Sequence, residues 1–334
     1  MTIVFVRGAG VFSLQKRESG KDMNEMKIFV DSGAYSLQIK YIRDKKTKDK
    51  LAFYKSKDFW EFVDSYAKFI KENKHLIETY VNVDIPFYPE FTWKVQKYLE
   101  DIHKLQPLPV FHIFEDFDWL KKYIDNYGYI AISGTAKFVS KSAWMVHIGD
   151  PAFNLICDDK GMPRVKVHGL ALTSPDLVID FPIFSADSTS WMQFGKYGLI
   201  IIPKKRNGKF IYNESPHIIK VSSRKKSKTD YENFINLSPM IQKQIIEYLE
   251  SINLKMGKSN LEAVDFDKTK YEIPVSDKEV SSKEIVIEKG VCNDNDSRDQ
   301  ANLQYYLDLE ANIPPWPRPW KRKRKGMLTR LPIP

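Results

Sequence analysis

The first two hundred residues repeat one pattern: a short run of β-branched or aromatic residues, a polar residue or glycine at its end, and then a stretch of helical periodicity. Such alternation of strand and helix indicates a parallel sheet with helical crossovers. There are eight such runs, namely IVFV from Ile3, KIFVDSG from Lys27, ETYVNVD from Glu78, PLPVFHIF from Pro107, YIAISG from Tyr129, RVKVHGL from Arg164, PIFSADS from Pro182 and GLIIIP from Gly198.

Eight strands with intervening helices favour the α/β class and, within it, a TIM-like (β/α)8 barrel. The clearest expected helix is SKDFWEFVDSYAKFIKEN, with Ser56 as its N-cap. Further helices are expected after Pro89, Glu115 and Ser174. An open doubly wound sheet is the alternative, but no GxGxxG motif follows a strand, so a dinucleotide-binding fold has little support.

The pattern ends at Pro203. We therefore expect residues 1–203 to form the catalytic barrel, and residues 204–260 to form a basic segment and a helix that completes or flanks it. That helix has Ser238 as N-cap and Pro239 at its first position. The polar residues 261–310 are typical of a linker, and the Trp/Pro-rich residues 311–334 predict a basic, extended C-terminal arm.

The net charge of +9 is unevenly distributed. Residues 203–230 contain nine basic and two acidic side chains, and residues 311–334 contain seven basic side chains and no acid, so the rest of the chain is acidic. Clustered cations favour a polyanion partner such as nucleic acid, although a basic tail can also serve solubility alone. The candidate phosphate-binding residues are Lys204, Lys205, Arg206, Arg224, Lys225, Lys226, Lys321, Arg322, Lys323 and Arg324.

Other classes of protein lack support. Only two cysteines are present, Cys157 and Cys292, far apart and without CxxC spacing, and no HxH or HExxH motif occurs, so no metal site is expected. The N-terminal sequence is too briefly apolar for a signal peptide, and no apolar run is long enough to span a bilayer. These features predict an intracellular protein with no membrane role.

Carboxylates recur where the expected strands end. Asp31, Asp84 and Asp187 each follow an apolar run, and an aspartate there is costly to bury unless it is hydrogen-bonded or functional. Converging carboxylates suit glycosyl transfer, in which one attacks the anomeric carbon and another moves a proton. Each could instead serve only a local turn, loop or helix start. His112 and His168 lie on apolar strands, where a histidine is more often part of the core than a ligand.

Five motifs stand at these strand ends, in chain order DSGAYS, NVDIP, ISGTAK, KVHGLALTSPDL and FSADSTSW. Together they resemble the motifs of the tRNA-guanine transglycosylase superfamily, and most closely those of its phage branch, which inserts 7-deazaguanines into DNA. The likeness covers Lys27 to Pro203. DSGAYS corresponds to the DSGGFQ-like signature of the family.

The resemblance implies a role for each motif. Asp187 is expected to attack C1′ and form a covalent glycosyl-enzyme, and Asp31 to act as general acid and base. Asp84 is expected to read the Watson–Crick edge of the base, with no cofactor required. The remaining expected substrate-binding residues are Ser32, Gly33, Gly134, Thr135, Ala136, His168 and Gly169.

Two departures from the family bear on the substrate. The zinc-binding subdomain of the tRNA enzymes has no counterpart here, and Ala34 and Ser36 stand where the signature has glycine and glutamine. We therefore expect exchange of guanine for a 7-deazaguanine such as preQ0 in DNA, in the cytoplasm of a phage-infected host, with a protein partner as an option. The alternatives are the same exchange on tRNA, hydrolysis of the N-glycosidic bond, or a barrel that only binds nucleic acid.

Overall fold

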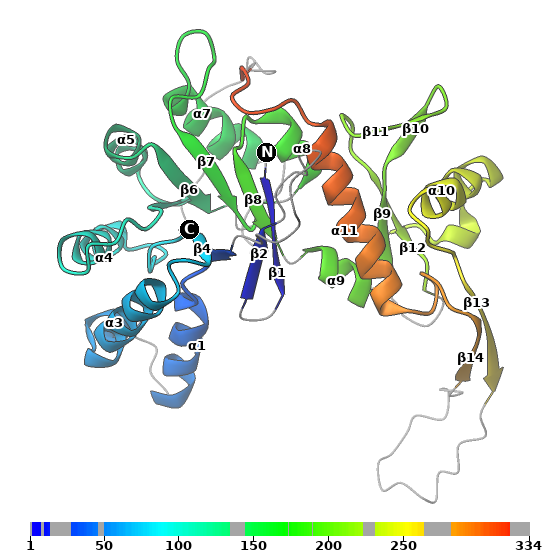
Figure 1. Ribbon diagram of the computed structural model, residues 1–334, viewed down its shortest axis with the longest axis horizontal. Coiled ribbons are helices and arrows are strands. Elements are labelled where there is room, and N and C mark those ends of the chain that lie inside the picture. Colours follow the sequence, from blue (N-terminus) through cyan, green and yellow to red (C-terminus); the bar gives the residue numbers. More distant parts are fainter. Residues whose placement is uncertain are drawn as a thin grey trace, which may run out of the picture. The chain divides into compact units, whose positions relative to one another are not determined.

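The computed structural model describes residues 2–7, 10–13, 28–45, 50–133, 144–172, 174–188, 190–222, 231–263 and 282–320. The fold is mixed α/β and contains parallel sheets (Figure 1). The chain divides into two compact units. Unit 1 comprises Met1–Thr189 and Glu310–Pro334, and unit 2 comprises Ser190–Leu309.

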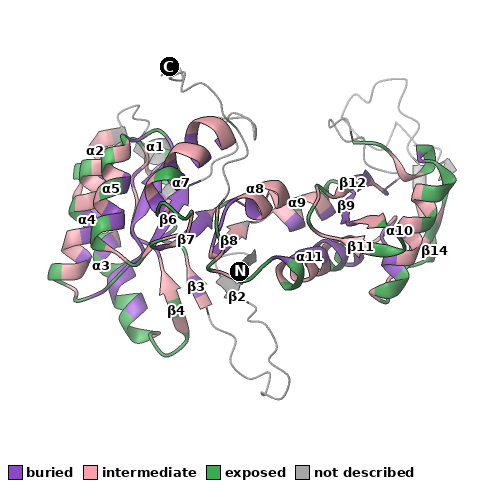
Figure 2. Ribbon diagram, turned by 90° about the horizontal axis from the view of Figure 1, so that it is seen from above, coloured by how far each residue is buried: buried purple, intermediate pink, exposed green. Residues whose placement is uncertain are grey.

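Unit 1 contains a six-stranded sheet in which five consecutive strands are parallel and β2 is antiparallel at one edge. Two of its strands, Val110–His112 and Tyr129–Ser133, are buried along nearly their whole length, as is typical of strands covered on both faces, and their sequences are largely apolar (Figure 2). In spatial order the strands are β2 (Gly10–Ser13), β1 (Thr2–Arg7), β8 (Ser185–Ser188), β7 (Lys166–Leu170), β6 (Tyr129–Ser133) and β5 (Val110–His112).

A second parallel pair precedes β5 in the chain. It consists of β3 (Ile28–Val30) and β4 (Ile77–Tyr80). A parallel bridge between Val81 and Leu108 joins the end of β4 to the segment just before β5, and β2 lies against β3. The two sheets of unit 1 are therefore continuous through β4 and β5 at the level of backbone hydrogen bonds.

Helices cover the sheet of unit 1, and the helices expected after Ser56, Pro89, Glu115 and Ser174 are present as α3, α4, α5 and α8. Ser56 Oγ accepts a hydrogen bond from Phe59 N and caps α3, and Asp116 caps α5 through Asp118 N. The buried face of α3 packs in an apolar cluster with residues of α4, and α5 packs against β5 and β6. The helices of unit 1 are α1 (Ala34–Lys45), α2 (Lys50–Lys55), α3 (Lys57–Glu72), α4 (Pro89–Asp101), α5 (Phe117–Asn126), the π-helix η1 (Met145–Gly149), α7 (Asp150–Ile156) and α8 (Pro175–Asp180).

The chain returns to unit 1 near its C-terminus and packs there. The guanidinium of Arg318 donates hydrogen bonds to the carbonyls of Val178, Ile179 and Phe181, at the end of α8, over 2.6–2.7 Å. Trp320 packs on the aromatic cluster that contains Phe181, and its backbone N–H donates to the carbonyl of Gly161. Residues 313–320 are therefore a docked segment, although the sequence predicts an extended basic arm from residue 311.

Unit 2 is built around its own core. Its strands are β9 (Leu199–Ile202), β10 (Lys204–Arg206), β11 (Lys209–Ile211), β12 (His217–Lys220), β13 (Lys258–Ala263) and β14 (Ser282–Glu288). They form three antiparallel pairs, β9 with β12, β10 with β11 and β13 with β14. The helices are α9 (Ser190–Lys196), the 3-10 helix η2 (Phe234–Asn236), α10 (Pro239–Ser251) and α11 (Asn295–Asn312).

Two features differ from the sequence expectation. The eighth apolar run is a strand, β9, but it pairs antiparallel with β12 in unit 2 instead of extending the parallel sheet. Residues 261–310, expected as a polar linker, contain β14 and most of α11. The helix buries Arg298 and Asn302, and Asn302 bonds the backbone of Trp191, Leu199 and Ile201. The polar sequence of α11 therefore gives no indication that the helix is part of the core.

No helix in the described ranges is long and apolar enough to cross a membrane.

Candidate active site

Three aspartates stand at the carboxyl ends of strands in unit 1. Asp31 directly follows β3, Asp84 lies a few residues beyond β4, and Asp187 lies near the end of β8. The charges of Asp84 and Asp187 both act on Asp31. The three carboxylates that the sequence singles out therefore lie close enough for the charges of Asp84 and Asp187 to influence Asp31.

Asp31 has the most perturbed acidity of the three aspartates. Burial of the carboxylate by the surrounding protein, and then the negative charges of Asp84 and Asp187, raise the pKa of Asp31 from 3.8 to about 6. A hydrogen bond from Ser32 N to its Oδ1, at 2.7 Å, acts in the opposite direction but does not cancel the rise. The residue keeps an exposed surface. Asp31 can therefore gain and lose a proton near neutral pH while open to a ligand.

Asp187 is held by one of its two oxygens. Its Oδ1 accepts hydrogen bonds from His168 Nε2 at 3.1 Å and from the backbone N of Ala171 at 2.9 Å. Ala171 adopts a positive φ of 53°, a conformation that costs a non-glycine residue energy. Two donors on Oδ1 fix the orientation of the carboxylate.

His168 supports Asp187 from inside the sheet. Its side chain is fully buried, and its ring stacks on Phe29 with centroids 4.3 Å apart. Its Nδ1 lies 2.6 Å from Ser185 Oγ, which in turn lies 2.5 Å from the hydroxyl of Tyr129. Both ring nitrogens contact protein side chains in this arrangement, whereas the sequence resemblance assigns His168 to substrate binding.

A second histidine–carboxylate group lies on the neighbouring strand ends. Nε2 of the buried His112 is 3.0 Å from Asp84 Oδ2, an ion-pair distance without regular hydrogen-bond geometry. Burial opposes protonation of His112, but the adjacent Asp84 and the charge of Glu115 outweigh it and raise the pKa of the ring.

Glu115 is itself buried. Its Oε2 accepts a hydrogen bond from His112 N at 3.1 Å, whereas its Oε1 has no hydrogen-bond partner among the described residues. Burial raises the pKa of Glu115 from 4.5 to about 7, against the opposing influence of His112. The position of Glu115, three residues after the strand histidine, was visible in the sequence, but its burial was not.

Two aromatic rings stand beside this group at the same strand ends. Phe87 follows Asp84 by three residues and Phe114 follows His112 by two, and the rings stack with centroids 5.5 Å apart and an interplanar angle of 16°. Both side chains are exposed, by 54% and 39%. Phe87 has a φ of 71°, which is rare for a bulky residue and is typical of functional sites.

The structure describes three of the other predicted substrate-binding residues. Ser32 is buried and Gly33 has a φ of 70°, and together they lead from Asp31 into α1. Gly169 is buried in β7, where a Cβ would lie 3.0 Å from Leu172 Cβ, so packing limits this position. Gly134, Thr135 and Ala136 lie outside the described residues.

The predicted phosphate-binding residues that the structure describes carry ion pairs within unit 2. Lys204 and Arg206 both reach Glu214, at 3.6 and 3.2 Å, and Lys205 reaches Glu247 at 2.6 Å. Arg224, Lys225, Lys226, Lys321, Arg322, Lys323 and Arg324 lie outside the described residues.

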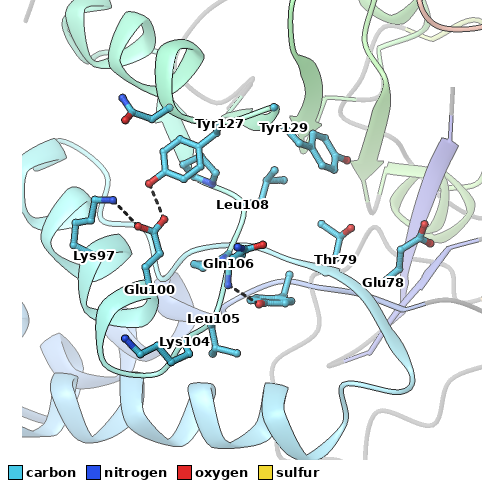
Figure 3. A pocket seen from close by; sticks show the side chains of 15 residues that line it. Glu78, Thr79, Lys97, Glu100, Lys104, Leu105, Gln106, Leu108, Tyr127 and Tyr129 are labelled. Atoms are coloured by element: carbon cyan, nitrogen blue, oxygen red, sulfur yellow. Dashed lines mark hydrogen bonds and ion pairs between the residues drawn. The ribbon is translucent and has the colours of Figure 1, made fainter.

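A pocket of about 710 Å³ lies elsewhere in unit 1, at the starts of β5 and β6 (Figure 3). Its wall includes Tyr129, whose hydroxyl belongs to the hydrogen-bond chain of Asp187. On its other side Glu100 accepts hydrogen bonds from Lys97 and Tyr127. None of the three aspartates lines this pocket.

The sequence contains a partial signal for the support of Asp187. Ser185 and Asp187 are two residues apart on one strand, a spacing that places both side chains on the same face of the sheet. No sequence signal marks Tyr129, because its contact with Ser185 depends on the packing of the folded sheet.

Within the described ranges, no group of three or more His, Cys, Asp or Glu side chains is arranged to hold a metal ion.

Comparisons with protein-family models, with curated proteins and with solved structures find no match to this chain.

Proposed function

We propose that the protein exchanges guanine in a polynucleotide for a 7-deazaguanine base through a covalent intermediate on Asp187. DNA is the first choice of polymer and tRNA the second. The observation that carries this proposal is the electrostatic coupling of three strand-end carboxylates, of which one is tied by two donors and another has a pKa of about 6. Groups with such different environments are suited to different steps of one reaction.

In the first step Asp187 is the nucleophile. A lone pair of Oδ2 forms a bond to C1′ of the target nucleoside, and the C1′–N9 bond breaks with its electron pair moving to guanine. The protonated form of Asp31 supplies the proton that neutralises the departing base. The pKa of Asp31, about 6, makes both of its protonation states accessible near neutral pH.

The second step reverses the first with a different base. Asp31 takes the N9 proton of the incoming 7-deazaguanine, N9 attacks C1′, and the C1′–Oδ2 bond breaks to return the Asp187 carboxylate. Two inversions retain the β-configuration of the nucleoside. The exchange needs no nucleoside triphosphate and no redox cofactor, because one glycosidic bond is broken for each one that is formed.

Base recognition falls to Asp84 and the two exposed aromatic rings. One oxygen of Asp84 lies beside His112, and the other would accept hydrogen bonds from N1–H and the exocyclic amine of guanine. Phe87 and Phe114 would stack on the extruded base or its neighbour, since aromatic side chains bind any base through its π-face. In duplex DNA the guanine would first have to leave the helix.

Binding of the phosphates is assigned to the two basic segments. The ion pairs of Lys204, Lys205 and Arg206 are solvent-accessible and therefore weak, so that phosphates can compete for these cations. Such binding would release counterions and weaken steeply with salt.

We also propose that the strands of unit 1 form the wall of a barrel. Support comes from the bridge between Val81 and Leu108, which links β4 to the start of β5, and from the position of β2 against β3. Seven parallel strands and the antiparallel β2 would then complete the circle without β9. In such a barrel the three aspartates would stand at the mouth formed by the carboxyl ends of the strands.

The test is incubation of the pure protein with guanine-labelled DNA and, separately, guanine-labelled tRNA, each with preQ0 or a related 7-deazaguanine. Nucleoside mass spectrometry should show release of guanine and a matching 7-deazaguanine nucleoside, which identifies the polymer. The Asp187→Asn variant should bind the polymer without exchange. Abasic sites in place of the new nucleoside would indicate a hydrolase, and intact binding without any reaction would indicate a binding protein.

A further inference from the structure

The support of Asp187 extends across three strands. His168 on β7 lies opposite Ser185 on β8 and Ala131 on β6, and the parallel register places paired side chains on one face of the sheet. The resulting chain of contacts runs from Asp187 through His168 and Ser185 to Tyr129 at the start of β6. His168 is fully buried and Ser185 is nearly so.

The number of protons available along this chain of hydrogen bonds determines which atom of each pair is the donor. An ionised Asp187 can only accept, so the hydrogen bond at 3.1 Å requires a proton on His168 Nε2. In a neutral imidazole Nδ1 is then an acceptor, and the hydroxyl of Ser185 must point toward it. Ser185 has no second proton, so its oxygen accepts from the hydroxyl of Tyr129. The Nε2–H of His168 and the hydroxyls of Ser185 and Tyr129 each donate one hydrogen bond, and each donates to the next group along the chain toward Asp187.

We infer that Ser185 and Tyr129 are positioning residues that hold His168 in its Nε2–H tautomer and thereby fix Asp187 for attack. The opposite tautomer would present the Nε2 lone pair to a carboxylate, which would repel Asp187 and leave its Oδ1 with the backbone N–H of Ala171 alone. The catalytic part of this inference rests on the proposed function, whereas the tautomer can be measured without any substrate.

Because His168 and Ser185 are buried, the hydrogen bond between them cannot be replaced by one to water without cost. With Ser185 removed, Nδ1 of His168 would be an unpaired polar atom in the core, a state that proteins avoid. The phenol of Tyr129 remains a donor at neutral pH, because burial raises its pKa above the ordinary value. Its side chain reaches the pocket at the starts of β5 and β6, so the chain connects Asp187 with the opposite edge of the sheet (Figure 3).

The first measurement is the tautomer of His168, from the two ring ¹⁵N shifts in the full-length protein, with His168→Asn used to assign the signals. The inference requires Nε2 to be protonated and Nδ1 to be a hydrogen-bonded acceptor. In Ser185→Ala the Nδ1 shift should move to the value of an unbonded acceptor, or the two tautomers should mix. A wild-type proton on Nδ1, or an unchanged spectrum in Ser185→Ala, overturns the inference whether or not the protein exchanges bases.

The second measurement is the rate of base exchange. Ser185→Ala should lower kcat by about tenfold to a hundredfold, as is typical when the partner that orients a histidine is removed, with KM little changed. Tyr129→Phe should have a smaller effect, about threefold to tenfold. Tyr127→Phe is the matched control, because Tyr127 lines the same pocket but donates to Glu100 instead. An equal loss in both tyrosine variants would contradict the inference.

A double-mutant cycle separates positioning from mere stability. Glutamine at position 168 offers an amide N–H near the site of Nε2 and has no tautomers. In the His168→Gln background, Tyr129→Phe should therefore cause no further loss of kcat. Full additivity of the two substitutions would show that Tyr129 acts independently of the tautomer and would refute its assigned role.

Discussion

The carboxylate of Asp84 acts on Asp31, the next carboxylate along the strand ends, and raises its pKa. Two of the causes that bring the pKa of Asp31 to about 6 are charges on other side chains, so each can be removed by substitution without changing the shape of the site.

This coupling predicts the pH dependence of exchange. The first step uses protonated Asp31, so the rate should fall as the pH rises above about 6. Asp84→Asn removes the negative charge of Asp84, so the pKa of Asp31 should fall and the decline in rate should begin at a lower pH. The readout is kcat/KM against pH, with Asp118→Asn on the outer part of α5 as control. A limb that stays in place in Asp84→Asn would contradict the coupling.

The role of Asp187 predicts a separation of binding from chemistry. Asp187→Asn retains the shape of the side chain but removes the nucleophile, so exchange should fall by about a thousandfold or more. Affinity for the polymer should stay within about threefold of that of the wild type, because the basic segments are intact. Denaturing mass spectrometry of the wild type with substrate should show a glycosyl adduct, and the variant should show none.

Glu115 predicts how stability changes with pH. Because burial raises its folded-state pKa to about 7, the folded protein binds more protons than the unfolded chain between about pH 4.5 and 7, and stability is lost as the pH rises through this window. Glu115→Gln should therefore be more stable than the wild type at pH 8, by about 1–3 kcal/mol. Urea unfolding at pH 5 and pH 8 tests this, since the gain should shrink at pH 5.

The stacked rings predict a contribution to single-strand binding. Phe114→Ala should weaken the binding of a single-stranded oligonucleotide by about fivefold to tenfold, since base stacking is worth ~1–3 kcal/mol. Ile102, which is also exposed but follows the far end of α4, provides the control as Ile102→Ala. Fluorescence anisotropy at fixed salt measures both. Equal affinities of the two variants would show that the two rings do not contribute to binding of the oligonucleotide.

The docked segment predicts two different outcomes of truncation. Removal of residues 321–334 deletes the basic run but leaves Trp320 in place, so it should weaken polymer binding and make it less dependent on salt. Trp320→Ala should instead lower the free energy of unfolding by about 2 kcal/mol, because it uncovers Phe153 and Phe181. Calorimetry and salt-dependent binding distinguish the two effects.

The sequence predicts the regular parts of unit 1 well, because apolar runs and helix caps are local signals. Ser56 caps a helix that begins at the next residue, as expected. Asp31 directly follows β3, whereas Asp84 lies a few residues beyond β4 and Asp187 lies within β8. Their grouping could be anticipated because parallel strands place their carboxyl ends at one edge.

The sequence does not predict what depends on distant contacts. The side chain of Asn302 is polar, and only the backbone groups it meets on β9, far away in the chain, explain its burial. Arg318 counts as part of a basic patch by composition, but it binds the carbonyls at the end of α8. The resemblance assigns His168 to substrate binding, whereas in the structure its ring nitrogens contact Ser185 and Asp187.

The docking of Trp320 and the burial of Asn302 bear on how the chain folds in the cell. Synthesis proceeds from the N-terminus, so Phe181 and β9 leave the ribosome well before Trp320 and Asn302 do. The cluster around Phe181 and the backbone of β9 therefore lack these partners while the intervening chain is being made. Neither unit can complete its core until these later residues have emerged.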